Sequence, residues 1–266
     1  MASFHLVDAF TDTAFRGNPA GVVMLADGPV DADLAQRVAA EVGASETAFV
    51  HRDGDGWRLR WWTPTTEVDL CGHATLAAAH VLYATGAAAG TAPVAFATRS
   101  GTLVATRDGT GRIQLDLPAW PVAAHPTPSG LDAVLGPVPG RYLGRTRVTQ
   151  ANDLVEVADP DLLDAVDPDP AAVAALGAGG LILVSPGAGT DAAMRYLAPA
   201  LGVDEDPVTG SAACTVAPLW AARLGRAEVT IEQRSKRGGH LVCRLEGDRV
   251  HVGGHAVTTI SGVLHI

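Results

Sequence analysis

The sequence has few cysteines and no long apolar run, and each shortage excludes a class of protein. Its three cysteines, Cys71, Cys214 and Cys243, are too few and too scattered to predict a disulfide framework or a zinc site. No apolar stretch approaches the roughly 18 residues that indicate a membrane-spanning helix. The first residues, MASFHLVDAF, lack a basic segment followed by an apolar one, so we expect no signal peptide and a cytoplasmic protein.

Charged side chains are also scarce. They make up 18% of the 266 residues, whereas hydrophobic residues make up 47%. A chain this apolar folds around a core, which excludes extended disorder. The formal net charge is −10. Because nucleic acids and anionic membranes bind basic surfaces, this balance argues against both as partners.

Motifs of several common enzyme classes are absent. The sequence has no P-loop for nucleotide phosphates, no HExxH zinc motif and no GxSxG nucleophile elbow. Cys71 and His73, and separately His251 and His255, lack the further partners that a metal site requires. We therefore expect no bound metal.

The predicted elements follow the same order twice. In each half a loop leads into an Ala-rich helix, at residues 72–83 and 210–224, and an apolar strand and a hairpin follow. Because these features recur at a nearly constant offset, we expect an internal duplication, although chance recurrence of a common order is the alternative. The proline-rich segment 118–140 would then connect an N-terminal half, 1–117, to a C-terminal half, 141–266.

Both predicted helices start among small and polar residues, namely Cys71, Gly72, Thr209, Gly210 and Ser211. A helix N-terminus carries unpaired N–H groups and a partial positive charge, and glycine lets a ligand approach the backbone. Two such ends that face each other would suit a carboxylate or a developing oxyanion. The alternative is ordinary capping by Thr209 or Ser211.

Ionisable side chains stand beside these helix starts. Glu46 leads into an apolar strand, where a buried carboxyl would have a raised pKa, unless it is a solvated loop residue. His73 lies at a helix start that disfavours its charged form, so we expect a neutral ring that relays a proton or donates a hydrogen bond. Asp206 either orients His73 across a cleft or complements the helix dipole.

Cys71 directly precedes the first of these helices, a position that lowers the pKa of a thiol. The matching residue of the second half is Thr209, so a racemase with one thiol on each face of its substrate is not supported. We interpret Cys71 as a packed side chain, and Cys214 and Cys243 as core residues.

Four stretches of the sequence together resemble the PhzF-like proteins, also called the phenazine biosynthesis PhzC/PhzF family. They are GNPAGV at 17–22, ASETAFV at 44–50, TPTTEVDLCGHATL at 63–76 and DEDPVTGSAAC at 204–214. The resemblance implies an α+β fold of the diaminopimelate epimerase-like type. In that fold, two pseudo-symmetric halves each wrap a mostly antiparallel sheet around a central helix.

The resemblance also implies an active site between the halves, at the N-terminal ends of the two central helices. The characterised reaction in the family isomerises trans-2,3-dihydro-3-hydroxyanthranilate, and a glutamate moves the proton. By match of motifs, the catalytic residues here are Glu46, His73 and Asp206. Those expected to bind a small carboxylate substrate are Cys71, Gly72, Thr209, Gly210 and Ser211. Members of the family are commonly homodimers and use no metal or organic cofactor.

One pair of residues keeps other functions open. Related epimerases and proline racemases carry catalytic cysteines at the positions of Cys71 and Thr209, and hydroxyproline dehydratase relatives show a Cys/Thr pair. An amino-acid epimerase or a hydroxyproline-type dehydratase that uses Cys71 and Thr209 is therefore the alternative. A binding protein that lost the reaction is a further one, but Glu46 and His73 argue against it.

Overall fold

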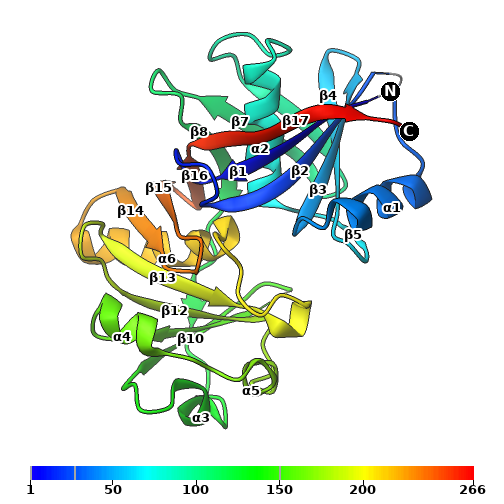
Figure 1. Cartoon of the computed structure of the whole chain (residues 1–266). Helices are drawn as coiled ribbons and strands as arrows, with labels where there is room; N and C mark the ends of the chain where they lie inside the picture. Colours follow the sequence, from blue (N-terminus) through cyan, green and yellow to red (C-terminus); the bar gives the residue numbers. More distant parts are fainter. Residues whose placement is uncertain (1, 27, 150) are drawn as a thin grey trace. The chain divides into compact units, whose positions relative to one another are not determined.

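The computed structural model describes residues 2–26, 28–149 and 151–266. The chain forms two compact units (Figure 1). Unit 1 comprises Met1–Asp116 and Gly253–Ile266, and unit 2 comprises Leu117–Val252. No helix within the described ranges is long and apolar enough to span a membrane.

Unit 1 is a sheet that packs around one helix. Its strands are β1 (Ala2–Ala9), β2 (Asn18–Leu25), β3 (Glu46–Asp53), β4 (Gly56–Trp62), β5 (Glu67–Val68), β6 (Val94–Thr98), β7 (Gly101–Arg107), β8 (Ile113–Pro118) and β17 (Ala256–Leu264). Neighbouring strands are antiparallel except for the parallel pairs β2–β3 and β4–β6. Strand β17, from the end of the chain, pairs with β1 (Figure 1).

The helix inside unit 1 is α2 (Gly72–Ala84). Its side chains are mostly alanine and other apolar groups, and nearly all are buried, as a helix that is apolar all round must be. The second helix, α1 (Ala32–Val42), is amphipathic and packs its buried face against Phe49 and Trp62. Asp31 caps α1, and Gly43 ends it in a left-handed conformation.

Unit 2 also packs a sheet around one helix. Its strands are β9 (Val122–Ala123), β10 (Arg141–Thr146), β11 (Asn152–Glu156), β12 (Gly180–Pro186), β13 (Ala192–Leu197), β14 (Glu228–Gln233), β15 (Gly239–Glu246) and β16 (Arg249–Gly254). The central helix is α6 (Gly210–Leu224). The shorter helices are α3 (Leu131–Leu135), α4 (Pro160–Ala165), α5 (Pro170–Ala174) and the 3-10 turn Pro199–Leu201.

The strand pairing of unit 2 repeats that of unit 1. The parallel pairs β11–β12 and β13–β14 match β2–β3 and β4–β6, and the antiparallel pairs β12–β13 and β14–β15 match β3–β4 and β6–β7. In both units the central helix lies in the connection between the two strands of the second parallel pair. This repetition of pairing supports the duplication inferred from the sequence.

The compact units differ from the predicted halves in two places. The segment 118–140 contains β9 and α3 and belongs to unit 2, where β9 pairs with β10. Residues 253–266 belong to unit 1 because β17 pairs with β1. Unit 2 thus holds β9, which follows the last hairpin of the first repeat. Unit 1 holds β17, which follows the last hairpin of the second repeat.

Candidate active site

Three of the predicted site residues meet in unit 1. Glu46 is the first residue of β3, and Cys71 and His73 flank the first residue of α2. The His73 ring lies between the other two side chains. Its Nε2 is 3.1 Å from Glu46 Oε2, and its Nδ1 is 3.6 Å from Cys71 Sγ. A strand start and a helix start therefore place a carboxyl, an imidazole and a thiol in one cluster.

This cluster is largely shielded from water. The exposed fractions of the His73 and Glu46 side chains are 8% and 19%, and Cys71 is buried. Glu46 Oε2 is itself buried, and it faces the ionisable ring of His73.

The charges of Glu46 and His73 depend on each other. Burial by itself raises the pKa of Glu46, but the positive charge of His73 and the polar contacts of Ser45 and Cys71 outweigh it, and the pKa lies below its ordinary value. Burial by itself lowers the pKa of His73, but the adjacent Cys71 and Glu46 outweigh it and raise the pKa well above the ordinary value. The resting pair is therefore carboxylate and imidazolium.

These charges correct two expectations from the sequence. A raised pKa for Glu46 and a neutral His73 were both wrong, because each group was considered without the partner that stabilises its charge. A lowered pKa for Cys71 was wrong as well. Burial and the charge of Glu46 raise the pKa of this thiol, against the opposing effect of His73. The interpretation of Cys71, Cys214 and Cys243 as packed side chains is confirmed, because all three are buried.

Ser45 also belongs to the cluster, although no motif singled it out. Its Oγ is 3.3 Å from His73 Nε2, 3.1 Å from the carbonyl oxygen of Pro19 and 3.3 Å from Asn18 Oδ1. These contacts place the Ser45 hydroxyl beside the ring, and its hydrogen bond to Glu46 is one of the effects that lower the pKa of that carboxyl.

In unit 2, Asp206 and Thr209 meet before α6. The Thr209 hydroxyl donates a hydrogen bond to Asp206 Oδ2. Gln233, fully buried at the end of β14, fixes this turn from behind. Its Oε1 accepts from Thr209 N at 2.7 Å, and its Nε2 donates to the Asp206 carbonyl at 2.7 Å and to Thr209 Oγ1 at 3.1 Å. Gln233 was missed because its separation from Asp206 along the chain leaves no local signal.

The starts of the two central helices are not capped by side chains. The residues at the cap positions, Cys71 and Thr209, make no side-chain hydrogen bond to the first turn of α2 or α6. By contrast, the carboxylates of Asp31, Asp159 and Asp169 accept from first-turn amides of α1, α4 and α5. Thr209 is therefore not the ordinary cap that was the alternative.

The local backbone does not require a glycine at the start of α2. A Cβ built on Gly72 meets no atom within 4 Å, and its φ is not positive. An alanine would therefore fit, and the missing side chain leaves the space above the first amides open. Gly210 is buried at the start of α6, and Ser211 follows it in a half-buried position.

The structure thus assembles two sets of predicted residues. Glu46, Cys71 and His73 form one in unit 1, and Asp206 with Thr209 forms the other in unit 2, next to Gly210. The meeting of the two sets across a cleft and the homodimer stay predictions.

The unit 1 set also contains side chains of types that hold metal ions, and their donor atoms lie within 4.8 Å of one another. A tetrahedral ion needs its ligands to converge on one point at about 2.0–2.3 Å. Here the thiol and the carboxylate face different nitrogens of one imidazole. Because an imidazole presents one nitrogen to an ion, this arrangement suits proton transfer better.

Comparisons with known proteins agree with this fold. The family model PhzC-PhzF, described as phenazine biosynthesis-like protein, matches residues 7–262. An uncharacterized isomerase from Pseudomonas aeruginosa is 46% identical over 263 residues, which are 99% of this chain and 98% of that protein. An uncharacterized isomerase from Halalkalibacterium halodurans is 42% identical, over 98% of this chain and 97% of that one.

A solved structure is similar over the whole chain. The crystal structure of a PhzF family protein from Enterococcus faecalis superimposes with a TM-score of 0.91 at 33% identity, covering 100% of this chain and 99% of that one. With the strand pairing, this similarity confirms the predicted diaminopimelate epimerase-like fold. The names of the relatives support the prediction of an isomerase, and none of them specifies a substrate.

Proposed function

This chain belongs to the PhzC/PhzF family of phenazine biosynthesis-like proteins, and we propose that it is an isomerase that moves a proton on a small carboxylate substrate through Glu46. One observation carries this proposal. Glu46 Oε2 is buried and 3.1 Å from His73 Nε2, so it faces an ionisable ring. An oxygen so placed can take up a proton and give it back.

In this mechanism Glu46 acts first as a base and then as an acid. Because His73 lowers the pKa of Glu46, Glu46 is a carboxylate at rest and can remove a proton from a substrate carbon. The electron pair of the broken C–H bond enters the adjacent π-system of the substrate. Protonated Glu46 then returns the proton to a second carbon on the same face, so the substrate is isomerised with no net gain or loss of protons.

Negative charge develops on the substrate while Glu46 holds the proton. The His73 imidazolium and the N-terminal ends of α2 and α6 are the groups that would stabilise this charge and hold the substrate carboxylate. Asp206 and Thr209 would bind polar substituents. A ring that bears a carboxylate, an amine and a hydroxyl, as in dihydro-hydroxyanthranilate, matches these groups, and the proposal requires no metal or organic cofactor.

One contact favours a second function, an amino-acid epimerase or hydroxyproline-type dehydratase that uses Cys71 and Thr209. Cys71 Sγ lies 3.6 Å from His73 Nδ1, so the thiol is in contact with an ionisable ring. Two observations weigh against it. Burial raises the pKa of the thiol, and the Thr209 hydroxyl already donates to Asp206.

The two functions are separated by a pair of variants assayed with trans-2,3-dihydro-3-hydroxyanthranilate and with a panel of amino acids. Our proposal predicts that Glu46→Gln loses at least about a thousandfold in turnover while Cys71→Ala stays within about tenfold of the wild type. The reverse pattern would favour the epimerase or dehydratase. If the wild type converts none of these compounds, the named substrate is withdrawn and other cyclic carboxylates are screened.

A further inference from the structure

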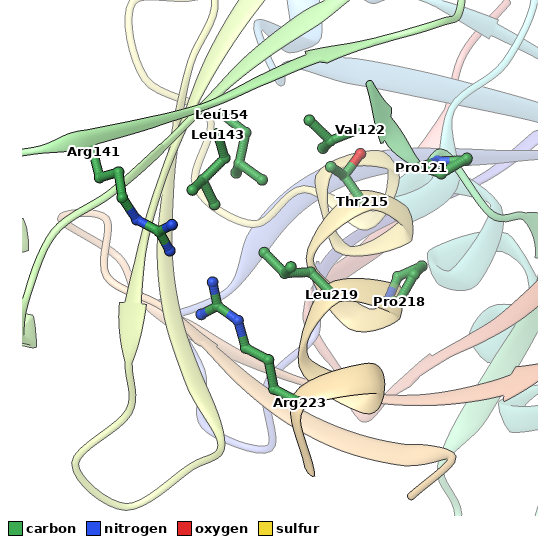
Figure 2. Close-up of a pocket in the computed structure, with 9 residues that line it drawn as sticks. All are labelled: Pro121, Val122, Arg141, Leu143, Leu154, Thr215, Pro218, Leu219 and Arg223. Carbon is green, nitrogen blue, oxygen red and sulfur yellow. The ribbon is translucent and has the colours of Figure 1, made fainter. Parts of the chain in front are cut away.

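Unit 2 contains a cavity of about 390 Å³ between the second half of α6 and strands β9 to β11 (Figure 2). Its size falls within the range of small-molecule sites, which spans roughly 300–1,000 Å³. Leu143, Leu154 and Leu219 form much of its wall. None of the residues that line it belongs to the candidate active site, so it is a second place on this unit where a ligand can fit.

A buried hydroxyl in this cavity lacks a partner. Thr215 is 1% exposed, and its Oγ1 has no hydrogen-bond partner in the described ranges. A helical threonine can bond its hydroxyl to the carbonyl four residues earlier. Thr75 does so in α2, where Oγ1 donates to the Cys71 carbonyl at 2.5 Å. Because an unpaired buried hydroxyl is unfavourable, the Thr215 hydroxyl is available for a ligand.

The other end of the cavity carries positive charge. The guanidinium groups of Arg141 and Arg223 both pair with the carboxylate of Glu156. Two cations share one anion, so one positive charge remains for a ligand. The Arg141 and Arg223 side chains are 69% and 34% exposed, which places this charge at the mouth. Figure 2 shows the two guanidinium groups at one end and Thr215 at the other, with Leu219 between them.

We propose that this cavity binds an organic monocarboxylate whose ring carries a hydroxyl or carbonyl group opposite the carboxylate. The carboxylate would pair with Arg141 and Arg223 at the mouth. The ring would contact the leucine side chains, and the distal polar group would form the hydrogen bond that Thr215 lacks. This site is separate from the one in which Glu46 acts and does not depend on the proposed reaction.

Isothermal titration calorimetry of the full chain tests the proposal. The probes are 4-hydroxybenzoate and the longer 6-hydroxy-2-naphthoate, each beside its analogue without the hydroxyl, benzoate or 2-naphthoate. We expect at least one hydroxylated probe to bind about five- to tenfold more tightly than its analogue, the effect of one buried hydrogen bond. In Thr215→Val, which keeps the side-chain shape, this preference should fall to about one.

A charge variant and its matched control complete the test. Arg223→Gln should weaken binding of the preferred probe by at least about fivefold. Arg244→Gln removes the same charge from an exposed ion pair with Glu246 elsewhere in unit 2 and should leave binding unchanged. The proposal is overturned if neither hydroxylated probe binds at millimolar concentration. It is also overturned if the preference for the hydroxyl persists in Thr215→Val, as it would if the probes bound only at the candidate active site.

Discussion

Glu46 Oε2 lies 3.1 Å from His73 Nε2, at a buried junction between the start of β3 and the start of α2. His73 lowers the pKa of Glu46, and Cys71 and Glu46 together raise the pKa of His73, both against the effect of burial, which favours the neutral forms. The contact therefore determines how the candidate site starts its reaction, with the carboxylate as base. It also links the stability of unit 1 to pH.

The pair should stabilise the protein only over a limited pH range. The lowered pKa of Glu46 stabilises the folded protein at pH values above 4.5, the ordinary pKa of glutamate. The raised pKa of His73 stabilises it at pH values below 6.5, the ordinary pKa of histidine. The contribution is therefore full between these values. It is lost as the pH falls through the lowered pKa of Glu46, and as it rises through the raised pKa of His73.

Urea unfolding of the wild type and of His73→Gln measures this contribution. We expect the difference in free energy of unfolding to be largest near pH 5.5 and to shrink in alkaline solution. Equal differences at pH 5.5 and pH 10 would show that His73 is not charged in the folded protein.

Gly72→Ala should separate stability from activity. The new methyl group meets no atom within 4 Å and lies in a helix, so the melting temperature should stay the same or rise slightly. Turnover should fall at least about tenfold, because the methyl occupies space that the substrate needs over the first amides of α2. Gly109→Ala, at another unobstructed glycine, is the control and should retain full turnover. Unchanged turnover in Gly72→Ala would remove Gly72 from the site.

Gly17, just before β2, has a structural role that a matched pair of variants can show. Gly17 and Gly43 have nearly the same positive φ, +67° and +66°, but only at Gly17 would a Cβ lie 2.2 Å from the Ala9 carbonyl oxygen. Gly43→Ala should cost about 1 kcal/mol of folding free energy, the cost of the left-handed conformation. Gly17→Ala should cost about 3 kcal/mol or more, since the backbone must also move. Chemical denaturation compares them, and equal losses would contradict this role.

The predictable parts of this fold have local causes. The limits of α1, α2 and α6 follow from Asp31 as a cap and from Ala-rich runs that begin and end at loops. Helices α4 and α5 carry the same kind of signal, an aspartate at the cap followed by proline, which was overlooked. Strand β17 was missed because its stability comes from pairing with β1, at the opposite end of the chain, and much of it is exposed.

In the candidate site, too, features with a local sequence signal were predictable and features that depend on distant contacts were not. The positions of Glu46, Cys71 and His73 could be chosen from motifs, but their protonation could not. Their pKa values depend on a contact between β3 and α2 that no single stretch of sequence contains. Gln233 was missed for the same reason, because it supports Asp206 and Thr209 from a distant strand.

The role of Glu46 is best tested by proton NMR of trans-2,3-dihydro-3-hydroxyanthranilate in D2O, with wild type and Glu46→Gln in parallel. We expect the wild type to form the isomer, with the transferred hydrogen at the new carbon position either retained or replaced by deuterium. A folded Glu46→Gln should form none. Isomer formation by Glu46→Gln at a rate within about tenfold of the wild type would contradict the account, because the proton would then move without Glu46.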